Sequence, residues 1–147
     1  MIRIAVVADT HDHVPPGLVQ RLAAADEIWH LGDVCEPMTL AEFEQLGKPV
    51  QVVLGNNEWH ALWPVELHLE RDGWRFFLTH IPPRRAPAGV DFVLHGHTHV
   101  PRDETDITGV RWLNPGALSR PRGGTQAGFA WLLFAKGRPP EWRRETL

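Results

Sequence analysis

The sequence predicts a mixed α/β sandwich whose second sheet is largely antiparallel. Strand-like and helix-like segments alternate over the first third of the chain, which is typical of parallel strands joined by helices. After residue 60 helical patterns become scarce and a hairpin signal appears. No repeat, linker or low-complexity tract interrupts the 147 residues, so we expect one domain over residues 1–147.

The first third contains three expected strands and two expected helices. Residues 2–8 form an apolar run with β-branched side chains, as in a strand covered on both faces. A short amphipathic helix is expected over 15–23, a strand over 27–31, a second helix over 38–46 and a third strand over 50–54. This order implies parallel pairing through crossover helices.

The rest of the chain is predicted to consist mainly of strands. Segments 65–69 and 74–78 flank Asp72-Gly73, and Asp-Gly between two strand-like runs is a strong hairpin signal. Further strands are expected over 92–94, 110–113 and 129–134, with turn residues between them.

Charge and cysteine content limit the classes of function. A formal net charge of −3 gives no electrostatic reason to expect general nucleic-acid or membrane binding, and no apolar run approaches the length of a membrane span. The single cysteine, Cys35, excludes an intrachain disulfide, and the chain begins directly with a strand-like run and no secretory signal. We therefore expect a cytoplasmic protein, with homo-oligomer formation left open.

Polar side chains follow five of the expected strands at their carboxyl ends. They are Asp9 and His11, Asp33, Asn56, His80, and His97 and His99. Ligands bind at this edge of open α/β sheets. Carboxylates and imidazoles that converge there would repel one another or lack partners without a cation, and this mixture of oxygen and nitrogen ligands suits Mn, Fe, Zn or Co. Glycines at 32, 55 and 96 allow tight turns beside the ions.

Each motif alone also has an ordinary interpretation. Gly-Asp and Gly-Asn after a strand are commonly turns, Asp-x-His is rarely a metal site by itself, and His80 alone would be a core or rim histidine. Three histidines within residues 95–99 are harder to explain as a turn. The occurrence of all five motifs in order, each after a strand, favours a site for two metal ions.

In this order the motifs resemble the calcineurin-like metallophosphoesterase superfamily, whose pattern is Asp-x-His, Gly-Asp, Gly-Asn, His and Gly-His-x-His. Asn114-Pro115-Gly116 extends the similarity to the small prokaryotic phosphodiesterase branch, which is related to the metal-binding subunit of retromer. The resemblance implies a four-layer α-β-β-α sandwich of two mixed sheets with helices outside.

The resemblance also implies an activity, namely hydrolysis of a small phosphorylated substrate, a phosphodiester in preference to a monoester, by a metal-activated water. Two divalent ions are implied, Mn first, although Fe, Zn, Ni or Co would suit the same ligands. One ion is assigned to Asp9, His11, Asp33 and His99, and the other to Asp33, Asn56, His80 and His97. Asp33 bridges the two ions, and the expected catalytic residues are Asp33, Asn56 and His97.

The sequence departs from the superfamily pattern at three positions. Asn57 stands where many members have a histidine that protonates the leaving group, although the small phosphodiesterase branch tends to lack it. Substrates with acidic leaving groups, such as aryl phosphodiesters, should be least affected. Ile81 follows His80 where glycine is common, and Ala117 stands where serine is frequent. The missing histidine and the tryptophan content leave open a non-catalytic scaffold that binds partner proteins.

Other residues have weaker claims to a functional role. His30 is expected to be buried behind the site and Cys35 to be a small buried residue. Trp59 and Trp63 would form an aromatic wall of the site or cover the core or an oligomer interface. The remaining histidines, with structural or exposed roles, are His13, His60, His68 and His95. Loop arginines that would hold a second phosphate or belong to a solvated surface are Arg84, Arg85, Arg102, Arg120 and Arg122.

Overall fold

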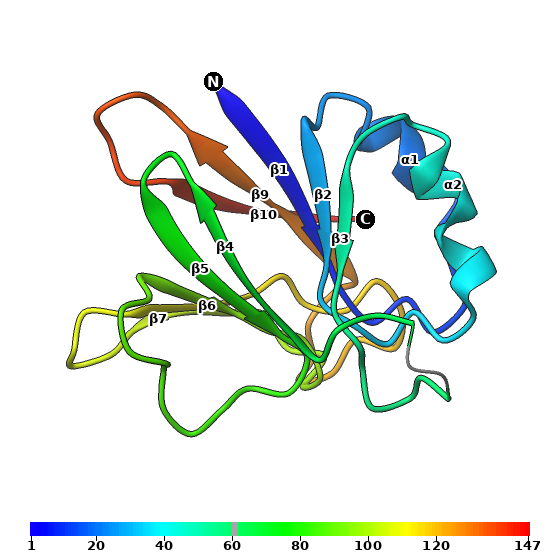
Figure 1. Ribbon diagram of the computed structural model, residues 1–147. Coiled ribbons are helices and arrows are strands. Elements are labelled where there is room, and N and C mark those ends of the chain that lie inside the picture. Colours follow the sequence, from blue (N-terminus) through cyan, green and yellow to red (C-terminus); the bar gives the residue numbers. More distant parts are fainter. Residues whose placement is uncertain (60–61) are drawn as a thin grey trace.

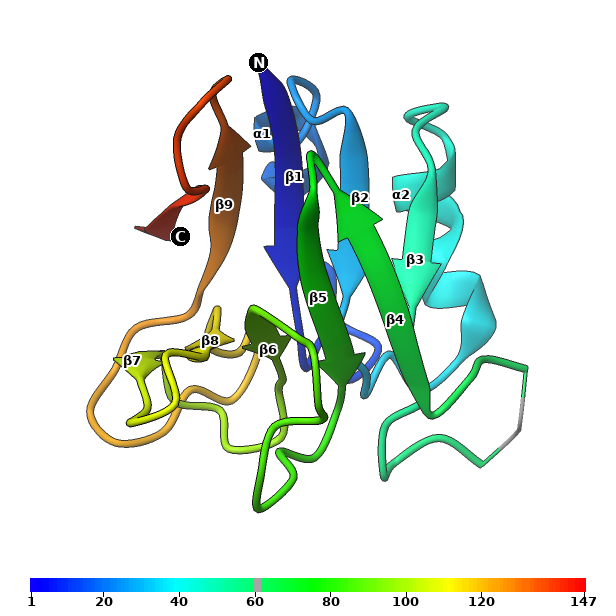
Figure 2. The same ribbon diagram turned by 60° about the vertical axis from the view of Figure 1, so that its left-hand side comes forward.

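The computed structural model describes residues 1–59 and 62–147, which form two β-sheets that face each other (Figure 1). His60 lies outside the described residues. The helices lie beside β2 and β3 on one side of the molecule (Figures 1 and 2).

The first sheet has five strands in the order β10-β9-β1-β2-β3. They are β1 (Ile2–Val7), β2 (Glu27–His30), β3 (Val50–Val52), β9 (Gly128–Phe134) and β10 (Glu141–Thr146). The first three strands pair in parallel, and β9 runs antiparallel to both β1 and β10. The parallel connections pass through α1 (Leu18–Arg21), and through η1 (Pro37–Leu40) followed by α2 (Ala41–Glu44). The predicted crossover arrangement is confirmed, but the first helix is shorter than expected and the second is divided into η1 and α2.

The second sheet also has five strands, in the order β4-β5-β6-β8-β7. They are β4 (Glu66–Arg71), β5 (Trp74–Thr79), β6 (Phe92–Leu94), β7 (Arg102–Thr105) and β8 (Arg111–Asn114). Asp72 and Gly73 have positive φ angles and close the β4–β5 hairpin as predicted. The sheet is mixed and not largely antiparallel as expected: β4 and β7 pair antiparallel with β5 and β8, whereas β5, β6 and β8 pair in parallel. Apolar strand patterns do not encode strand direction.

Two apolar layers hold the sandwich together. Side chains from both sheets form the inner layer, in which Trp29 of β2 packs edge-on against Phe76 of β5, with ring centroids 5.3 Å apart. A second layer joins the first sheet to the helices through Leu18, Leu22 and Phe43. Truncation of one such buried aromatic residue to alanine typically costs about 3–5 kcal/mol.

The outer face of the second sheet is covered without a helix. Every helical segment of the described residues lies before residue 45, and Ala86 and Val90 of the β5–β6 connection pack on Phe77, Val93 and Trp112. The predicted α/β fold of two mixed sheets is confirmed. In this chain, however, a loop takes the place of the expected outer helical layer.

An ion pair joins the two sheets at one end of the sandwich. Arg71, the last residue of β4, donates from Nε and Nη2 to the two carboxylate oxygens of Glu27, the first residue of β2, at 2.8 and 2.7 Å. Glu27 is buried in the sheet interface, so the two-pronged contact satisfies a carboxylate that water reaches poorly.

Two strands, β7 and β10, are not predicted by the sequence pattern. Both lie at a sheet edge, and their polar sequences RDET and EWRRET lack the alternation of apolar residues that marks a strand. Among the described residues, no helix combines the length and apolar character needed to cross a bilayer.

Candidate metal centre

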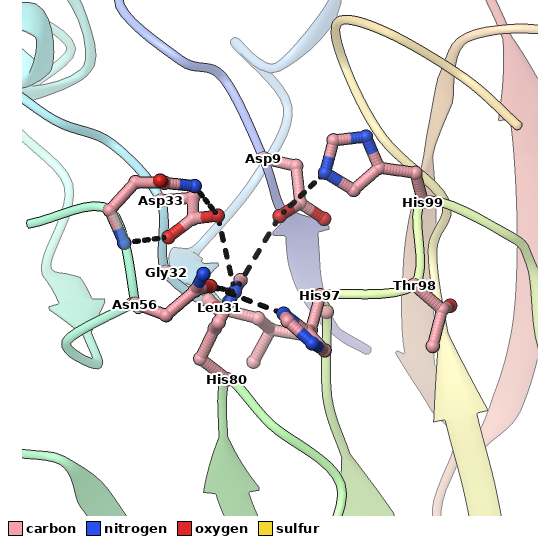
Figure 3. A network of polar contacts seen from close by, with 12 residues as sticks. Asp9, Leu31, Gly32, Asp33, Asn56, His80, His97, Thr98 and His99 are labelled. Carbon is pink, nitrogen blue, oxygen red and sulfur yellow. Dashed lines mark hydrogen bonds and ion pairs between the residues drawn. The ribbon is translucent and has the colours of Figure 1, made fainter.

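The seven candidate ligands meet where the two sheets come together. Those of the first sheet follow β1, β2 and β3, and those of the second sheet follow β5 and β6, so five strands deliver them to one edge as the sequence predicts. Figure 3 shows Asp9, Asp33, Asn56, His80, His97 and His99 around this edge, several pointing toward one another.

One group of four matches a complete set of ligands for an ion. Asp9, His11, Asp33 and His99 each offer a ligand atom, and these atoms all lie within 4.8 Å of one another. Ligands at about 2.1 Å from one ion lie roughly 3.0–3.4 Å apart when adjacent and about 4.2 Å apart when opposite. The group is therefore close to the size of a coordination shell, with its widest spacing limited to 4.8 Å. It is the quartet that the resemblance assigns to the first ion.

A second group of four adjoins the first and shares Asp33. Asn56 Oδ1 lies 2.8 Å from His80 Nε2 and 3.1 Å from His97 Nδ1, and His80 Nε2 lies 3.3 Å from Asp33 Oδ2. All four side chains assigned to the second ion are thus brought together. His80 and Asp33 are buried, whereas Asn56 is exposed, so this group borders the solvent.

Asp9 supports the presence of a cation on physical grounds. The residue is fully buried, and neither carboxylate oxygen accepts a hydrogen bond from the described residues. Three imidazole Nε2 atoms, of His11, His80 and His99, lie 3.5–4.0 Å from its Oδ1. Burial raises the pKa of Asp9 to about 7, which shows how poorly the chain alone stabilises its charge. A cation between these groups would satisfy the carboxylate, so the residues fit a metal ion.

Backbone carbonyls orient the two most buried candidate histidines. His80 Nδ1 donates to the carbonyl of Leu31 at 2.8 Å, and His99 Nδ1 donates to the carbonyl of Arg120 at 2.7 Å. Each contact occupies Nδ1 and turns Nε2 toward the site, where loss of its proton would free a lone pair for a metal ion. This arrangement is typical of histidines that bind metals.

Asp33 is held as an anion between the two groups. The backbone N–H of Asn57 donates to its Oδ1 at 2.9 Å, and the Asn57 side-chain amide donates to its Oδ2 at 2.8 Å. Burial alone would raise the pKa of Asp33, but the hydrogen bonds from His80 and Asn57 outweigh it and hold the pKa below its usual range. An ionised carboxylate shared by both groups suits a bridging ligand.

The loops around the site carry unusual backbone conformations. Eight of the nine non-glycine residues with positive φ in the described part of the chain lie in these loops, and five of the eight are candidate ligands. Such conformations cost free energy and concentrate at functional sites. Gly32 is needed for a related reason, since an added Cβ would lie 2.7 Å from His80 Nδ1. At Gly55 an added Cβ would overlap the backbone N and the Oδ1 of Asp33.

Glu58 is a positioning residue that the sequence reasoning missed. Its Oε1 accepts from the backbone N–H groups of Val34 at 2.9 Å and Gly55 at 3.3 Å, and its Oε2 accepts from that of Cys35 at 2.6 Å. It therefore ties the loop that carries Asp33 to the loop that carries Asn56. The only sequence signal is an acidic residue shortly after Gly-Asn.

Buried polar side chains support the site from behind. His30 accepts from the N–H of Gly32 through Nδ1 and contacts the Thr10 hydroxyl through Nε2, as expected for a histidine behind the site. Burial lowers the pKa of His30 to about 3, so it is neutral. Asn114 donates to the Gly96 carbonyl and to the Thr98 hydroxyl. These bonds fix the loop of His97 and His99 and give the Asn-Pro-Gly motif a positioning role.

His95 also contacts this loop. Its Nδ1 bonds the Gly96 carbonyl at 2.9 Å, and its Nε2 lies 3.2 Å from the Arg102 guanidinium. Burial lowers the pKa of His95 to about 4, so it remains a neutral structural residue. His13 and His68 are exposed, in line with the interpretation given to them.

The remaining candidates belong to neither ligand group. Burial, followed by the charges of nearby carboxylates, raises the pKa of Cys35 to about 11, which keeps it as a thiol of low reactivity. Trp63 packs against the layer between the first sheet and the helices. Trp59 is 74 % exposed, and its indole N–H donates to Glu36 at 3.1 Å.

The sequence is similar to a family model and to proteins of known family. Residues 2–137 match the family model described as the calcineurin-like phosphoesterase superfamily domain. A probable metallophosphoesterase of Methanothermobacter thermautotrophicus is 31% identical over 139 residues, covering 81% of this chain and 78% of the relative. A phosphodiesterase of Methanocaldococcus jannaschii is 27% identical over 144 residues, covering 78% of this chain and 83% of the relative.

Solved structures share the fold over nearly the whole chain. An archaeal phosphodiesterase superposes with a TM-score of 0.82 at 23% identity, covering 99% of this chain and 100% of the other. Vps29 of Entamoeba histolytica complexed with zinc superposes with a TM-score of 0.77 at 19% identity, covering 98% of each chain. Together with the match over residues 2–137, these likenesses lead to one conclusion: the chain belongs to the calcineurin-like phosphoesterase superfamily.

Proposed function

We propose that the chain hydrolyses phosphate esters, and phosphodiesters in preference to monoesters, with two divalent ions held by the seven candidate ligands. The observation that carries the proposal is the pair of adjoining ligand groups that share Asp33, beside the fully buried Asp9 carboxylate that accepts no hydrogen bond from the described residues. Membership of a phosphoesterase superfamily supplies the class of reaction.

The exposure of each candidate ligand indicates its role in the proposed reaction. When bound, the ions supply Lewis acidity toward the phosphate oxygens and lower the pKa of the attacking water. Buried Asp9, His80 and His99 set the position of the site, whereas Asn56 is exposed and His97 half-buried, so these two can touch a bound substrate. The donor set of carboxylates, imidazoles and one amide suits Mn first, and also Fe, Zn, Ni or Co. We propose a cytoplasmic location as well.

The identity of residue 57 indicates which phosphate esters the chain would hydrolyse. In many superfamily members a histidine at this position protonates the leaving group, and here the Asn57 amide instead donates to Asp33. An amide cannot supply a proton at neutral pH. We therefore propose substrates whose leaving groups depart without protonation, such as aryl phosphodiesters.

The competing function is a non-catalytic scaffold for partner proteins. Asn57 favours it, because the chain lacks the acid of many active relatives, and so does the exposed Trp59 near the site. A scaffold gives no reason for both ligand groups to be complete, so we favour the enzyme.

A metal-reconstitution assay separates the two functions. Metal-stripped protein is assayed on bis-p-nitrophenyl phosphate and p-nitrophenyl phosphate with Mn, Ni, Co, Zn, Fe(II) or Mg added singly. Diester turnover that depends on a transition metal is expected. Asp33→Asn and His97→Ala should abolish most of it, whereas His68→Ala, which changes an exposed histidine on β4, should not. No turnover with any metal, in protein shown to bind two ions, would favour the scaffold.

A further inference from the structure

The five loop arginines, whose role the sequence leaves open, lie in three different environments. The guanidinium of Arg102 lies 3.2 Å from His95 Nε2 and 4.8 Å from the ring centroid of Trp112, so Arg102 is part of the structure behind the site. Arg84 and Arg85 are exposed on the β5–β6 connection and line a hollow outside the second sheet. Arg120 and Arg122 belong to the loop that precedes β9.

The loop of Arg120 and Arg122 is fastened to two candidate ligands. The Arg120 carbonyl accepts from His99 Nδ1 at 2.7 Å, and the Arg122 N–H donates to the His99 carbonyl at 3.1 Å. Ser119 donates from its N–H and its hydroxyl to the Asp9 carbonyl at 3.2 and 3.1 Å. The two arginines thus flank His99, and Arg120 adopts a positive φ of 54° that turns the chain there.

Both side chains are exposed cations. Neither guanidinium has a hydrogen bond or ion pair with the described residues, in contrast to Arg111 and Arg143, which pair with Asp103 and Glu141. Two guanidinium groups that have no partner among the described residues, and that lie beside the candidate metal centre, are available to an anion.

Backbone contacts place the two arginines next to the site. The Arg120 carbonyl accepts from His99 Nδ1, and the Arg122 N–H donates to the His99 carbonyl, so both side chains start from a loop that touches a candidate ligand. A substrate bound at the candidate metal centre would therefore lie beside these two side chains.

The charge balance indicates which substrates would gain from these arginines. Asp9 and Asp33 carry two negative charges at most, so a site that holds two divalent ions is already positive enough for the single charge of a phosphodiester. Two further guanidinium groups favour an additional anion, and their forked donors match phosphate oxygens. We propose that Arg120 and Arg122 form a subsite for a second phosphate group, so that the chain prefers phosphodiesters carrying a further phosphate. This inference rests on the proposed function.

A matched pair of chromogenic substrates tests the subsite. Thymidine 5′-(p-nitrophenyl phosphate) and its 3′-phosphorylated counterpart release p-nitrophenolate from the same bond and differ only by the distant phosphate. We expect kcat/KM of the metal-loaded protein to be roughly tenfold or more higher for the 3′-phosphorylated ester. The ratio should approach one in Arg120→Gln/Arg122→Gln and stay at the wild-type value in Arg84→Gln/Arg85→Gln, which removes the same charge from exposed positions elsewhere. Added salt should lower the wild-type ratio.

Failure of the subsite and failure of the proposed function give different results. Turnover of both esters at equal kcat/KM overturns the subsite and leaves the phosphodiesterase intact. A preference that survives in Arg120→Gln/Arg122→Gln overturns the assignment to these arginines. If neither ester is turned over, the proposed function fails, and calorimetry still tests the subsite. Metal-loaded protein should then bind thymidine 3′,5′-bisphosphate more tightly than thymidine 5′-monophosphate, and equal Kd values overturn the subsite.

Discussion

Glu58→Gln tests whether one carboxylate holds the two loops of the candidate metal centre together. The Glu58 carboxylate accepts from three backbone N–H groups, those of Val34, Cys35 and Gly55. Glutamine keeps one acceptor oxygen but places an amide N–H₂ where Oε2 faces the Cys35 N–H. The substitution therefore removes a charge-assisted hydrogen bond, worth about 1.5–3 kcal/mol, and sets a donor against a donor.

We expect Glu58→Gln to lower the free energy of unfolding of the metal-free chain by about 2–3 kcal/mol, which corresponds to a loss of roughly 4–12 °C in Tm for a domain of this size. Metal affinity should fall by about 10–100-fold, because residues that orient metal ligands commonly have effects of this size. Urea unfolding measures the first quantity, and competition with a chromophoric chelator measures the second.

Glu42→Gln is the matched control, since Glu42 is exposed on α2 and its side chain makes no hydrogen bond or ion pair with the described residues. If Glu58→Gln and Glu42→Gln have the same free energy of unfolding and the same metal affinity, the three contacts of Glu58 do not hold the loops, and the reasoning is refuted.

Three further predictions concern the sheet interface and the site. Arg71→Met should lower the free energy of unfolding by about 1–2 kcal/mol at pH 7, since the Arg71 side chain is partly exposed. Burial alone would raise the pKa of Glu27, but Arg71 lowers it overall, so this stabilisation is present above the unfolded pKa of about 4.3 and is lost as pH falls through the folded pKa. Gly55→Ala should cost about 1–3 kcal/mol and weaken metal binding, because its Cβ would overlap Asp33. Asn57→Ala should weaken metal binding about tenfold yet leave the dependence of kcat on leaving-group pKa unchanged.

Each of these predictions has a clear contradicting result. A difference between wild type and Arg71→Met that stays constant from pH 7 to pH 3 would exclude the ion pair as its cause. For metal affinity, Gly47→Ala is the control for Gly55→Ala, because an added Cβ at Gly47 meets no atom within 4 Å, although its φ of 71° strains the backbone of alanine. Equal metal affinity in the two variants would contradict the steric argument. A leaving-group dependence that becomes steeper in Asn57→Ala would show that Asn57 does assist departure.

The sequence predicts the parts of this fold that burial controls. Segment 2–8 and the aromatic runs at 74–78 and 129–134 are recognisable because strands inside a sandwich must be apolar. The edge strands β7 and β10 pair through their backbones, and their side chains are polar apart from Trp142, which packs against the core, so residues 102–105 and 141–146 carry no such pattern. Strand direction is equally hidden, which explains the error over β5, β6 and β8.

The candidate ligands are more visible in the sequence than the residues that hold them in place. Candidate ligands such as Asp9 and His99 need particular side-chain chemistry at the ends of strands, and that is visible in a sequence. Glu58 and Asn57 act on backbone N–H groups and on Asp33 through the folding of the loops, and many residue types occupy such loop positions. Only their contacts in the folded structure distinguish Glu58 and Asn57 from neighbouring loop residues whose side chains face solvent.

The sandwich is fastened at its two ends by different chemistry. At the carboxyl edge, each ligand group draws on both sheets, with His99 completing the first and His80 and His97 the second. At the opposite end, the sheets are joined by Arg71 and Glu27. A chain stripped of metal by a chelator should therefore open locally at the carboxyl edge, while the ion pair keeps the opposite end closed. Acid would protonate Glu27 and weaken the ion pair. Chelation at low pH should therefore open both ends, and fast amide hydrogen exchange should then extend through the strands on either side of the inner apolar layer.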